Sequence, residues 1–455
     1  MKIALFGAGS LQFGYGTLGE IFQSKILEGA EIALMDINAE TLEEVRSTAV
    51  DFINKKELPF TVTATTSSEK ALKDADFVII SIEVGDRFEL WDMDWKVPLE
   101  FGIHQVYGEN GGPGGLFHAL RIIPPILEIC SGVDRICPEA TVFCYSNPMT
   151  AIVTTVTRKY PDMKFIGMCH EIASLERNLP SILKTEFSNL KLRSAGLNHF
   201  SILLEASYKD TGRDAYTDIR TKAPDFFRKE PGSSDVWEYT RKTGRTPETE
   251  GTIQRFILES GEKGKIRREW QDRTLFREIL SKFGYLPITS DSHLGEYIGW
   301  AWEKADLQGV MDFYSSYRSY LANSESKIEL KLKERVVPVM EGIVTDSGYE
   351  EAAVNIPNRG YIPDLPSWIA VEVPALIHSS NIEGITFDNY PKGFCALLRN
   401  YTGVYDLTAE AVLTGKKEYV IQALLANPVI SNISRIEEMV NMMLEQQSKW
   451  LGYIK

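Results

Sequence analysis

Cysteine is scarce in this sequence. Five cysteines occur among 455 residues, and no two of them form a Cys-x-x-Cys pair. Disulfide frameworks and zinc ribbons need several cysteines at short, regular spacing, so both are excluded. Four cysteines are expected to be small buried hydrophobic residues: Cys130, Cys137, Cys144 and Cys395.

The sequence also lacks an excess of positive charge, a membrane-length apolar run and a signal segment. Its 49 Lys and Arg face 63 Asp and Glu, for a net charge of −14, which disfavours nucleic acid and anionic lipid as partners. No apolar run approaches the ~18 to 20 residues of a membrane helix. Residues 1–6 lead into Gly7 without a charged-then-apolar leader. We therefore expect a cytoplasmic protein with a small-molecule partner.

What remains is an ordinary globular composition, with 44% hydrophobic and 25% charged residues. At ~150 residues per domain, the length allows two or three domains. Short apolar runs typical of strands alternate with helical periodicity in the first part of the chain. The expected strands are residues 2–6, 32–35, 60–63, 77–80 and 141–144, and the helical patterns include residues 18–26 and 119–130. This alternation predicts an α/β fold with a Rossmann-type, doubly wound parallel sheet.

The pattern changes at about residue 190, where longer charged segments and Gly/Pro-rich stretches begin. We expect a Rossmann domain at residues 1–190 and a mixed α+β domain at residues 191–455. Two helical patterns close the chain, at residues 409–426 and 434–451. The methionine-rich apolar stripe of the second pattern is interpreted as core or subunit packing.

A glycine turn follows the first expected strand. Gly7 and Gly9 would let the backbone approach a pyrophosphate at a helix N-terminus, with Ser10 beside them, although Gln12 stands where the fingerprint has a third glycine. Asp36 ends the second strand, where a carboxylate accepts from the ribose hydroxyls of NAD and repels the extra phosphate of NADP. The turn therefore predicts NAD binding, in preference to a purely structural turn.

Two further segments carry candidate contacts. Residues 108–115 hold five glycines and Glu109, and they are interpreted as a loop that closes over a ligand, or alternatively as a flexible surface loop. Asn147 follows the fifth strand at the sheet edge where such folds bind ligands, and is a candidate for contact with substrate or the nicotinamide ribose. Glu83, shortly after the fourth strand, is a further candidate cofactor contact.

Two clusters could support chemistry. Cys169, with His170 and Glu171 beside it, and His199 supply thiolate and imidazole groups that can bind a divalent transition metal. A buried cysteine and a core histidine are the alternative. Residues 290–297 bring two carboxylates, an imidazole and a phenol together, or they form a solvated loop and helix start.

The order of these motifs resembles that of a known family. The motifs are Gly-x-Gly-Ser at 7–10, Glu109 in its glycine-rich segment, Ser-Asn-Pro-Met at 146–149, Cys-His-Glu-Ile at 169–172, Gly-Leu-Asn-His at 196–199 and Val-Glu-Val-Pro at 371–374. Over essentially its whole length the chain resembles glycoside hydrolase family 4, the NAD- and manganese-dependent glycosidases. The resemblance implies an NAD-binding Rossmann domain joined to a substrate domain like that of lactate and malate dehydrogenases.

The resemblance also implies an unusual reaction route. NAD oxidises the sugar 3-hydroxyl, the ketone acidifies the C2 hydrogen, a base removes it, and the glycosidic oxygen leaves by elimination. Water then adds to C1, and NADH reduces C3 again. Mn²⁺ would act as a Lewis acid on the sugar oxygens. By position, Cys169 and His199 would be the metal ligands, and Asn147 and Glu109 would hold sugar hydroxyls.

Other roles also follow from the resemblance. The segment at 289–297 looks like that of branches using an aspartate as the C2 base, which makes Asp291 the candidate, with Tyr297 as the alternative. An imidazole at His170 suits proton transfer to or from the leaving oxygen near neutral pH, or it contacts substrate, as Glu171 would.

Substrate class is predicted from the Cys-His-Glu-Ile tetrapeptide, which looks most like the branch that cleaves α-galacturonides. The prediction is an α-galacturonidase acting on short galacturonides from pectin, as a homodimer or homotetramer. An α-glucuronidase or α-galactosidase of the same family is the alternative, followed by a hydroxy-acid dehydrogenase and a non-catalytic NAD sensor. The arginines available for a uronate carboxylate are Arg87, Arg121, Arg267 and Arg277.

Overall fold

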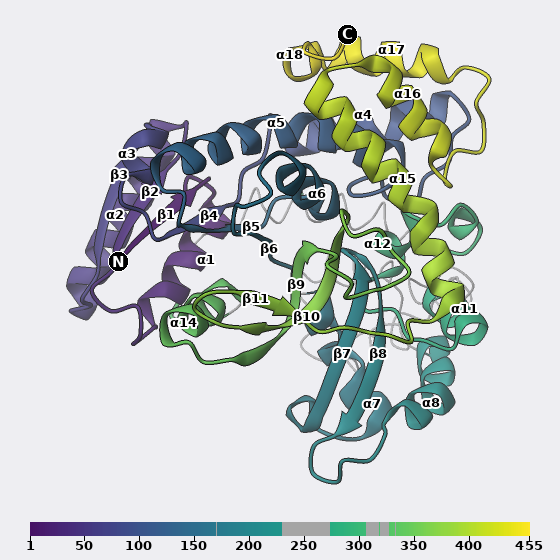
Figure 1. The fold of residues 1–455 in the computed structure, drawn as a ribbon, viewed down its shortest axis with the longest axis horizontal. Helices are drawn as coiled ribbons and strands as arrows, with labels where there is room; N and C mark the ends of the chain where they lie inside the picture. The colour runs from purple at the N-terminus through teal and green to yellow at the C-terminus, as the bar shows by residue number, and fades with distance from the viewer. Residues whose placement is uncertain (170, 230–273, 306–317, 319–326, 333) are drawn as a thin grey trace, which may run out of the picture.

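A computed structural model describes residues 1–169, 171–229, 274–305, 318, 327–332 and 334–455 (Figure 1). Its first part is a parallel sheet in the order β3-β2-β1-β4-β5-β6. The strands are β1 (Lys2–Phe6), β2 (Glu31–Met35), β3 (Thr61–Thr65), β4 (Phe77–Ile80), β5 (Thr141–Cys144) and β6 (Phe165–Gly167). The predicted α/β fold with a Rossmann-type sheet is confirmed.

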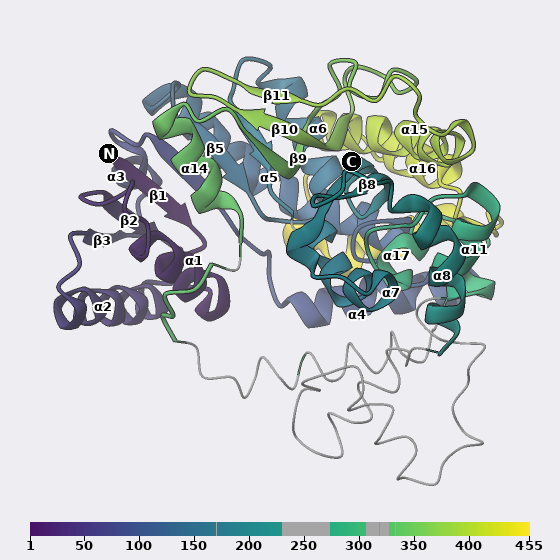
Figure 2. The same cartoon turned by 90° about the horizontal axis from the view of Figure 1, so that it is seen from below.

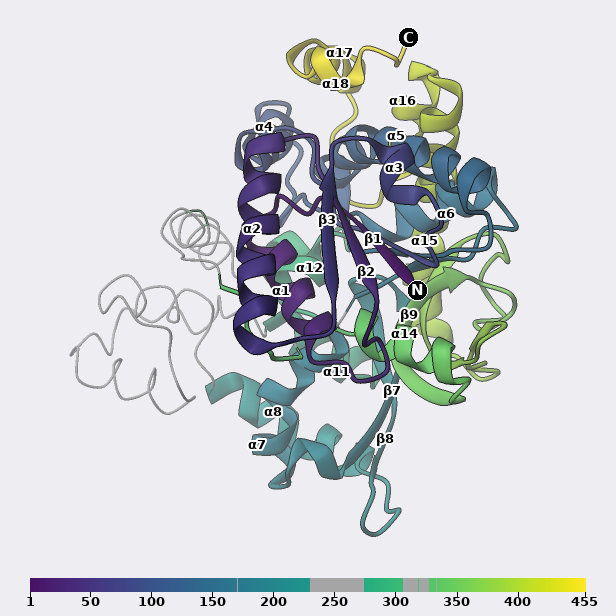
Figure 3. The same cartoon turned by 90° about the vertical axis from the view of Figure 1, so that its left-hand side faces the viewer.

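Helices cover both faces of this sheet, as in other doubly wound folds. Figure 3 shows α1 (Leu11–Phe22) and α2 (Ala39–Lys56) on one side of β1–β3, and α3 (Ser68–Leu72), α5 (Gly112–Ile136) and α6 (Met149–Lys159) on the other. The central strands are buried on both faces, which explains their continuous apolar sequences.

Helix α5 is long and apolar enough to cross a membrane by length and composition, with a mean hydropathy of 1.4 in its most apolar window. It is the one such helix among the described residues, and it corrects the expectation that no segment approaches this limit. Most of that window, 67%, is buried, and α5 packs against α4 (Arg87–Glu100) and α6. A core helix meets the same criterion, so α5 is weak evidence for a membrane span.

The second half extends the same sheet with antiparallel strands. The order continues β6-β9-β10-β7-β8, with β11 paired to β10. These strands are β7 (Leu190–Leu197), β8 (Phe200–Tyr208), β9 (Tyr349–Pro357), β10 (Ala370–Ile377) and β11 (Ile382–Gly384). The mixed character predicted for this half is therefore present, while the division into domains at residue 190 stays a prediction.

The helices of the second half form two groups. Figures 1 and 2 show one group beside β7 and β8, at the end of the molecule opposite β1–β3: α7 (Leu179–Leu183), α8 (Tyr216–Lys229) and α11 (Thr274–Phe283). In the sequence, α12 (Asp291–Gly295) and α14 (Val336–Thr345) come between these and the C-terminal group, and Figure 1 shows α14 beside β10 and β11. The C-terminal group packs on α4–α6 and comprises α15 (Lys392–Thr414), α16 (Lys417–Ala426), α17 (Ile436–Gln446) and α18 (Ser448–Leu451).

Two details of the C-terminal helices differ from the sequence prediction. The pattern at 409–426 is split, because Gly415 adopts a φ of 70° and ends α15. Helix α15 also begins much earlier than predicted. In α17 the apolar stripe is buried, with Met439 and Met443 inaccessible to solvent, so core packing is confirmed for it.

Candidate active site

A cleft of about 2090 Å³ lies at the carboxyl ends of the parallel strands. Its lining comes from the glycine turn, from the segments after β4 and β5, and from the Cys169 region. Pockets for drug-sized ligands are roughly 300 to 1,000 Å³. The cleft is therefore large enough for a dinucleotide and a second molecule together.

The glycine turn after β1 can accept no side chain at its two key positions. Gly7 has a φ of +85°, and a Cβ there would lie 1.9 Å from the Ser81 carbonyl oxygen. A Cβ on Gly9 would lie 2.8 Å from the Asp36 carboxylate. Ser10 caps α1, its Oγ accepting from the Phe13 N–H at 3.4 Å. Bare backbone at a capped helix N-terminus suits a pyrophosphate.

A third glycine of this turn escaped the sequence interpretation. Gly14 packs so closely that a Cβ would lie 2.3 Å from the Ala8 carbonyl oxygen. It therefore performs the close helix packing that the fingerprint assigns to the position of Gln12. The signal was present in the sequence as a glycine two positions later than the usual spacing.

Asp36 lies at the end of β2 and lines the cleft. Its carboxylate accepts from the Gly9 N–H at 2.8 Å and the Asn38 N–H at 3.0 Å. A carboxylate has about four lone-pair sites, so acceptor capacity remains for ribose hydroxyls. Glu83 and Asn147 also line the cleft. Their contacts with a cofactor stay predictions.

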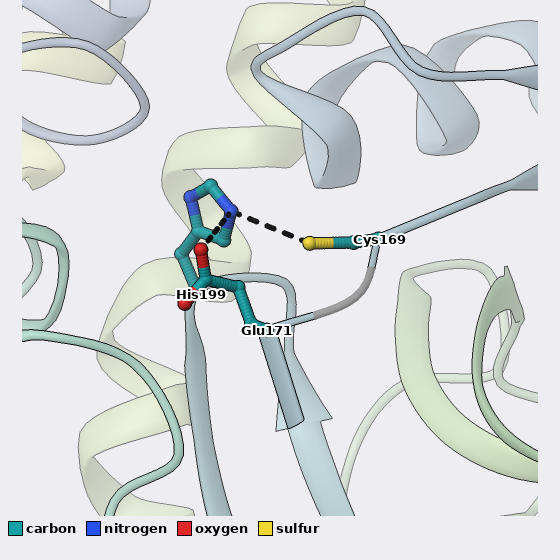
Figure 4. Close-up of side chains that lie close together, drawn as sticks. All are labelled: Cys169, Glu171 and His199. Carbon is teal, nitrogen blue, oxygen red and sulfur yellow. Dashed lines mark hydrogen bonds and ion pairs between the residues drawn. The ribbon is translucent and has the colours of Figure 1, made fainter. Parts of the chain in front are cut away.

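Three donor atoms converge on the wall of the same cleft (Figure 4). Cys169 follows β6, His199 lies in the turn between β7 and β8, and Glu171 begins a short 3₁₀ helix. The Cys169 Sγ lies 3.5 Å from the His199 Nε2, which lies 3.6 Å from the Glu171 Oε1. All three donors lie within 4.8 Å of one another. Thiolate, imidazole and carboxylate together fit a divalent transition metal.

Glu171 was predicted as a substrate contact, and the structure brings it to the two predicted metal ligands. Burial raises the pKa of the Cys169 thiol well above its usual value, and the carboxylates of Glu372 and Glu171 add to this effect. A bound divalent cation acts in the opposite direction, because it stabilises the thiolate directly. The chemistry of the donor set therefore fits a metal ligand cluster better than an isolated buried thiol.

Glu109 is a buried carboxylate fixed at the wall of the cleft. Burial raises its pKa, but the Arg87 guanidinium at 2.6 Å and the His293 imidazole at 3.6 Å outweigh burial and hold the pKa well below its usual range. The His118 Nδ1 contacts the Glu109 carbonyl oxygen at 2.9 Å. Glu109 is therefore ionised and can accept hydrogen bonds from a sugar.

His293 was not singled out from its cluster, yet it is the member that reaches the cleft. Its ring stacks on that of His199, with centroids 4.4 Å apart and planes 4° apart. Its Nδ1 lies 3.7 Å from Glu171 and its Nε2 3.6 Å from Glu109. Burial lowers the pKa of His293, but the two carboxylates raise it well above its usual value. The His293 ring therefore lies between the two carboxylates, with one nitrogen near each.

Neither candidate for the C2 base is among the described residues that line the cleft. Asp291 is fully buried and accepts from the Leu275 N–H at 2.8 Å and the Phe276 N–H at 3.1 Å, at the first turn of α11. Tyr297 is buried as well, and its hydroxyl donates to the Asn198 carbonyl at 3.3 Å. Both side chains are packed in the interior and form hydrogen bonds with backbone groups. His170 lies outside the described residues.

The glycine-rich segment at 108–115 is buried throughout, and α5 already begins at Gly112. Three side chains accept from its backbone: Gln105 from the Gly114 N–H at 3.1 Å, Tyr401 from the Gly112 N–H at 2.6 Å, and Glu296 from the Asn110 and Gly111 N–H groups. The alternative of a flexible surface loop is therefore wrong, whereas the interpretation that the segment covers a ligand stays a prediction, with Glu109 on the cleft wall. The segment is a fixed support for Glu109.

The arginines proposed for a uronate carboxylate are engaged or outside the cleft. Arg87 pairs with Glu109, and Arg121 is buried against Asp94 at 2.9 Å. Arg277 is not among the described cleft residues. Arg267 lies outside the described part of the chain.

Two family models match the chain. The model described as "Family 4 glycosyl hydrolase" matches residues 2–185, and the model of the family's C-terminal domain matches residues 194–430. An α-glucosidase of Erwinia rhapontici is 59% identical over 454 residues, covering 100% of this chain and 99% of that protein. An α-galacturonidase of Thermoanaerobacter italicus is 27% identical, covering 99% and 97%.

Solved structures agree in fold. A 6-phospho-α-glucosidase from gut microorganisms, in complex with NAD and Mn²⁺, is 17% identical with a TM-score of 0.75, covering 99% of this chain and 98% of that one. A 6-phospho-β-glucosidase from Thermotoga maritima, with manganese, NAD⁺ and glucose-6-phosphate, is 20% identical with a TM-score of 0.73, covering 99% of both chains.

Proposed function

The chain belongs to family 4 of the glycosyl hydrolases, and from this membership we propose that it is an NAD- and divalent-metal-dependent α-glucosidase. The observation that carries the substrate class is the 59% identity, over the full length, with an α-glucosidase. The α-galacturonidases among its relatives are 24% to 27% identical. The predicted galacturonide specificity therefore has less support than an α-glucoside.

The pairing of the described cleft arginines supports a neutral sugar. Each described arginine of the cleft already has a carboxylate partner: Arg87 has Glu109, Arg121 has Asp94, and Arg135 has Glu69. A uronate or a sugar phosphate would compete with these carboxylates for its counter-charge. A neutral hexoside needs hydrogen bonds alone.

The residues present fit both cofactors. The glycine turn with Asp36 suits NAD more than NADP, because the carboxylate charge repels a 2′-phosphate. Cys169, Glu171 and His199 would hold the divalent cation. When bound, NAD supplies reversible two-electron oxidation of a sugar hydroxyl, and the divalent cation supplies a Lewis acid.

The chain's own residues then bind and orient the sugar. Glu109 offers an ionised carboxylate to sugar hydroxyls, held in place by Arg87 and His293. Asn147 offers an amide at the end of β5, on the same cleft wall as the cofactor turn. The fixed segment under Glu109 keeps this geometry without reorganisation, which favours catalysis. No C2 base is proposed among the described residues.

A substrate panel tests the proposal. The protein would be supplied with NAD, Mn²⁺ and a thiol reductant, and assayed on nitrophenyl α-glucoside, α-galactoside, α-galacturonide and 6-phospho-α-glucoside. We expect kcat/KM for the α-glucoside to exceed the others by about 100-fold or more, since mismatched polar groups in a built pocket are costly. A galacturonide cleaved as fast as the glucoside would restore the galacturonidase prediction.

A second measurement tests the reaction route. Hydrolysis in D₂O should deposit deuterium at C2 of the released glucose, because the family route breaks and restores the C2–H bond in each turnover. NADH should not accumulate. Glucose without deuterium at C2 would indicate direct displacement at C1.

A further inference from the structure

The turn that carries His199 is fixed through its neighbour, Asn198. Asn198 is buried, its N–H donates to the Thr150 hydroxyl at 3.1 Å, and its carbonyl accepts from the Tyr297 hydroxyl at 3.3 Å. Its side-chain amide donates to the Glu372 carboxylate at 2.8 Å. Three distant segments thus hold one residue of a two-residue turn.

Glu372 lies on β10, behind the donor cluster, and is buried. Its carboxylate accepts from three neutral donors: the Asn198 amide, the Ser201 hydroxyl at 3.1 Å and the Asn355 amide at 3.4 Å. An ionisable side chain that is buried among neutral donors is costly, and Glu372 is not among the described residues that line the cleft. The sequence marks it only as part of Val-Glu-Val-Pro at 371–374.

Asn198 also adjoins the metal cluster, because it directly precedes His199 in the turn between β7 and β8. The hydrogen bond to Glu372 fixes its side chain, while the bonds to Thr150 and Tyr297 fix its backbone. Glu372 is therefore connected, through Asn198, to the residue whose imidazole lies beside Cys169 and Glu171.

We propose that Glu372 is a positioning residue of the metal site, which holds Asn198 and, through it, the turn that presents His199 to Cys169 and Glu171. Through Asn198 it sets the affinity of the cluster formed by Cys169, Glu171 and His199 for a divalent cation. Groups that orient metal ligands typically change metal affinity about 10- to 100-fold when removed. The inference rests on the metal site of the proposed function.

Cobalt binding tests this without turnover. Co²⁺ would be titrated into the full chain in the absence of NAD and sugar, and the thiolate-to-cobalt charge-transfer band recorded. In Glu372→Gln one carboxylate oxygen becomes an amide nitrogen, which cannot accept the hydrogen bonds that Asn198, Ser201 and Asn355 donate to Glu372. The side chain of Asn198 therefore loses its fixed orientation. We expect Co²⁺ affinity to fall about 10- to 100-fold and the band to shift. Unchanged affinity and an unchanged band would overturn the inference.

A double-mutant cycle separates positioning from simple charge removal. If Glu372 acts through Asn198, then Asn198→Ala should reproduce the loss, and the double variant should be no worse than either single variant. Additive losses would mean that Glu372 acts independently, which overturns the inference. Ser201→Ala is the matched control, because it removes one donor to Glu372 and leaves Asn198 in place; its effect should be smaller.

Folding is checked by thermal unfolding and by NAD binding, which depends on the other end of the cleft. Should Glu372→Gln not fold, Asn198→Ala decides alone, and a wild-type band in that variant overturns the inference. Wild-type protein without any thiolate band would refute the metal site itself. That outcome removes the metal from the proposed function together with this inference.

Discussion

The two ends of the cleft are built in different ways. The nucleotide end comes from short local motifs, a glycine turn and the carboxylate that ends the next strand, all within residues 7–36. The sugar and metal end is assembled from residues far apart in sequence, among them Glu109, Cys169, His199 and His293. Local motifs reveal the first end to sequence analysis, whereas the second depends on contacts that only the fold creates.

The largest effect should come from the metal end. Cys169→Ser replaces a thiolate with a poor neutral ligand, so we expect activity to fall by about 10³-fold or more while NAD affinity is unchanged. Steady-state assays and NAD titration measure the two ends separately. A folded variant with wild-type turnover would remove Cys169 from the metal site.

NAD binding at the nucleotide end should be weakened without any effect on the metal end. Asp36→Ser removes a charged acceptor, which is worth about 1.5 to 3 kcal/mol, so NAD should bind about tenfold more weakly or worse. Discrimination against NADP should relax at the same time, because the repelling charge is gone. Co²⁺ binding at the other end serves as the control and should not change. Equal affinities for NAD and NADP in the unaltered protein would contradict the assignment.

A substitution of Asp291 tests whether this residue has a structural role or a catalytic one. Its carboxylate satisfies two N–H groups at the start of α11, so Asp291→Asn should destabilise the fold by about 1 to 3 kcal/mol. Turnover by the folded fraction should stay within a few-fold of wild type. A well-folded variant that has lost nearly all activity would instead support Asp291 as the C2 base, as the sequence predicts.

The smallest effect concerns the support beneath Glu109. Burial raises the pKa of Glu296 to about 8, above its value of about 4.3 in an unfolded chain. Its stabilising contribution is therefore full below about pH 4.3 and is lost as the pH rises through about 8. Glu296→Gln mimics the protonated form of the side chain. The free energy of unfolding of this variant, relative to that of wild type, should therefore rise by about 1 kcal/mol between pH 7 and pH 9. Urea unfolding of both proteins at both pH values measures this difference. If the stabilities of wild type and variant changed equally with pH, the prediction would be contradicted.

The sequence predicted the elements whose signal lies in a short local segment of the chain. Apolar runs gave the parallel strands, and the order of motifs paired Cys169 with His199 across 30 residues. It could not foresee the hydrogen bonds of Asp291, because its carboxylate accepts from N–H groups 15 and 16 residues earlier, and its role as C2 base stays a prediction. It also could not foresee the burial of residues 108–115, since burial there depends on Tyr401 and Glu296, which lie far along the chain. Composition alone makes such a segment resemble a flexible loop.

The turn between β7 and β8 has a consequence for how the family can diversify. It contains two residues, Asn198 and His199, and His199 adopts a φ of 58°, a left-handed conformation that is uncommon for residues other than glycine. His199 is the proposed metal ligand, and Asn198 anchors the turn. An insertion or a deletion would therefore displace at least one of the two residues from its contacts. Changes of substrate range are therefore expected in other segments that line the cleft, with the length of this turn unchanged.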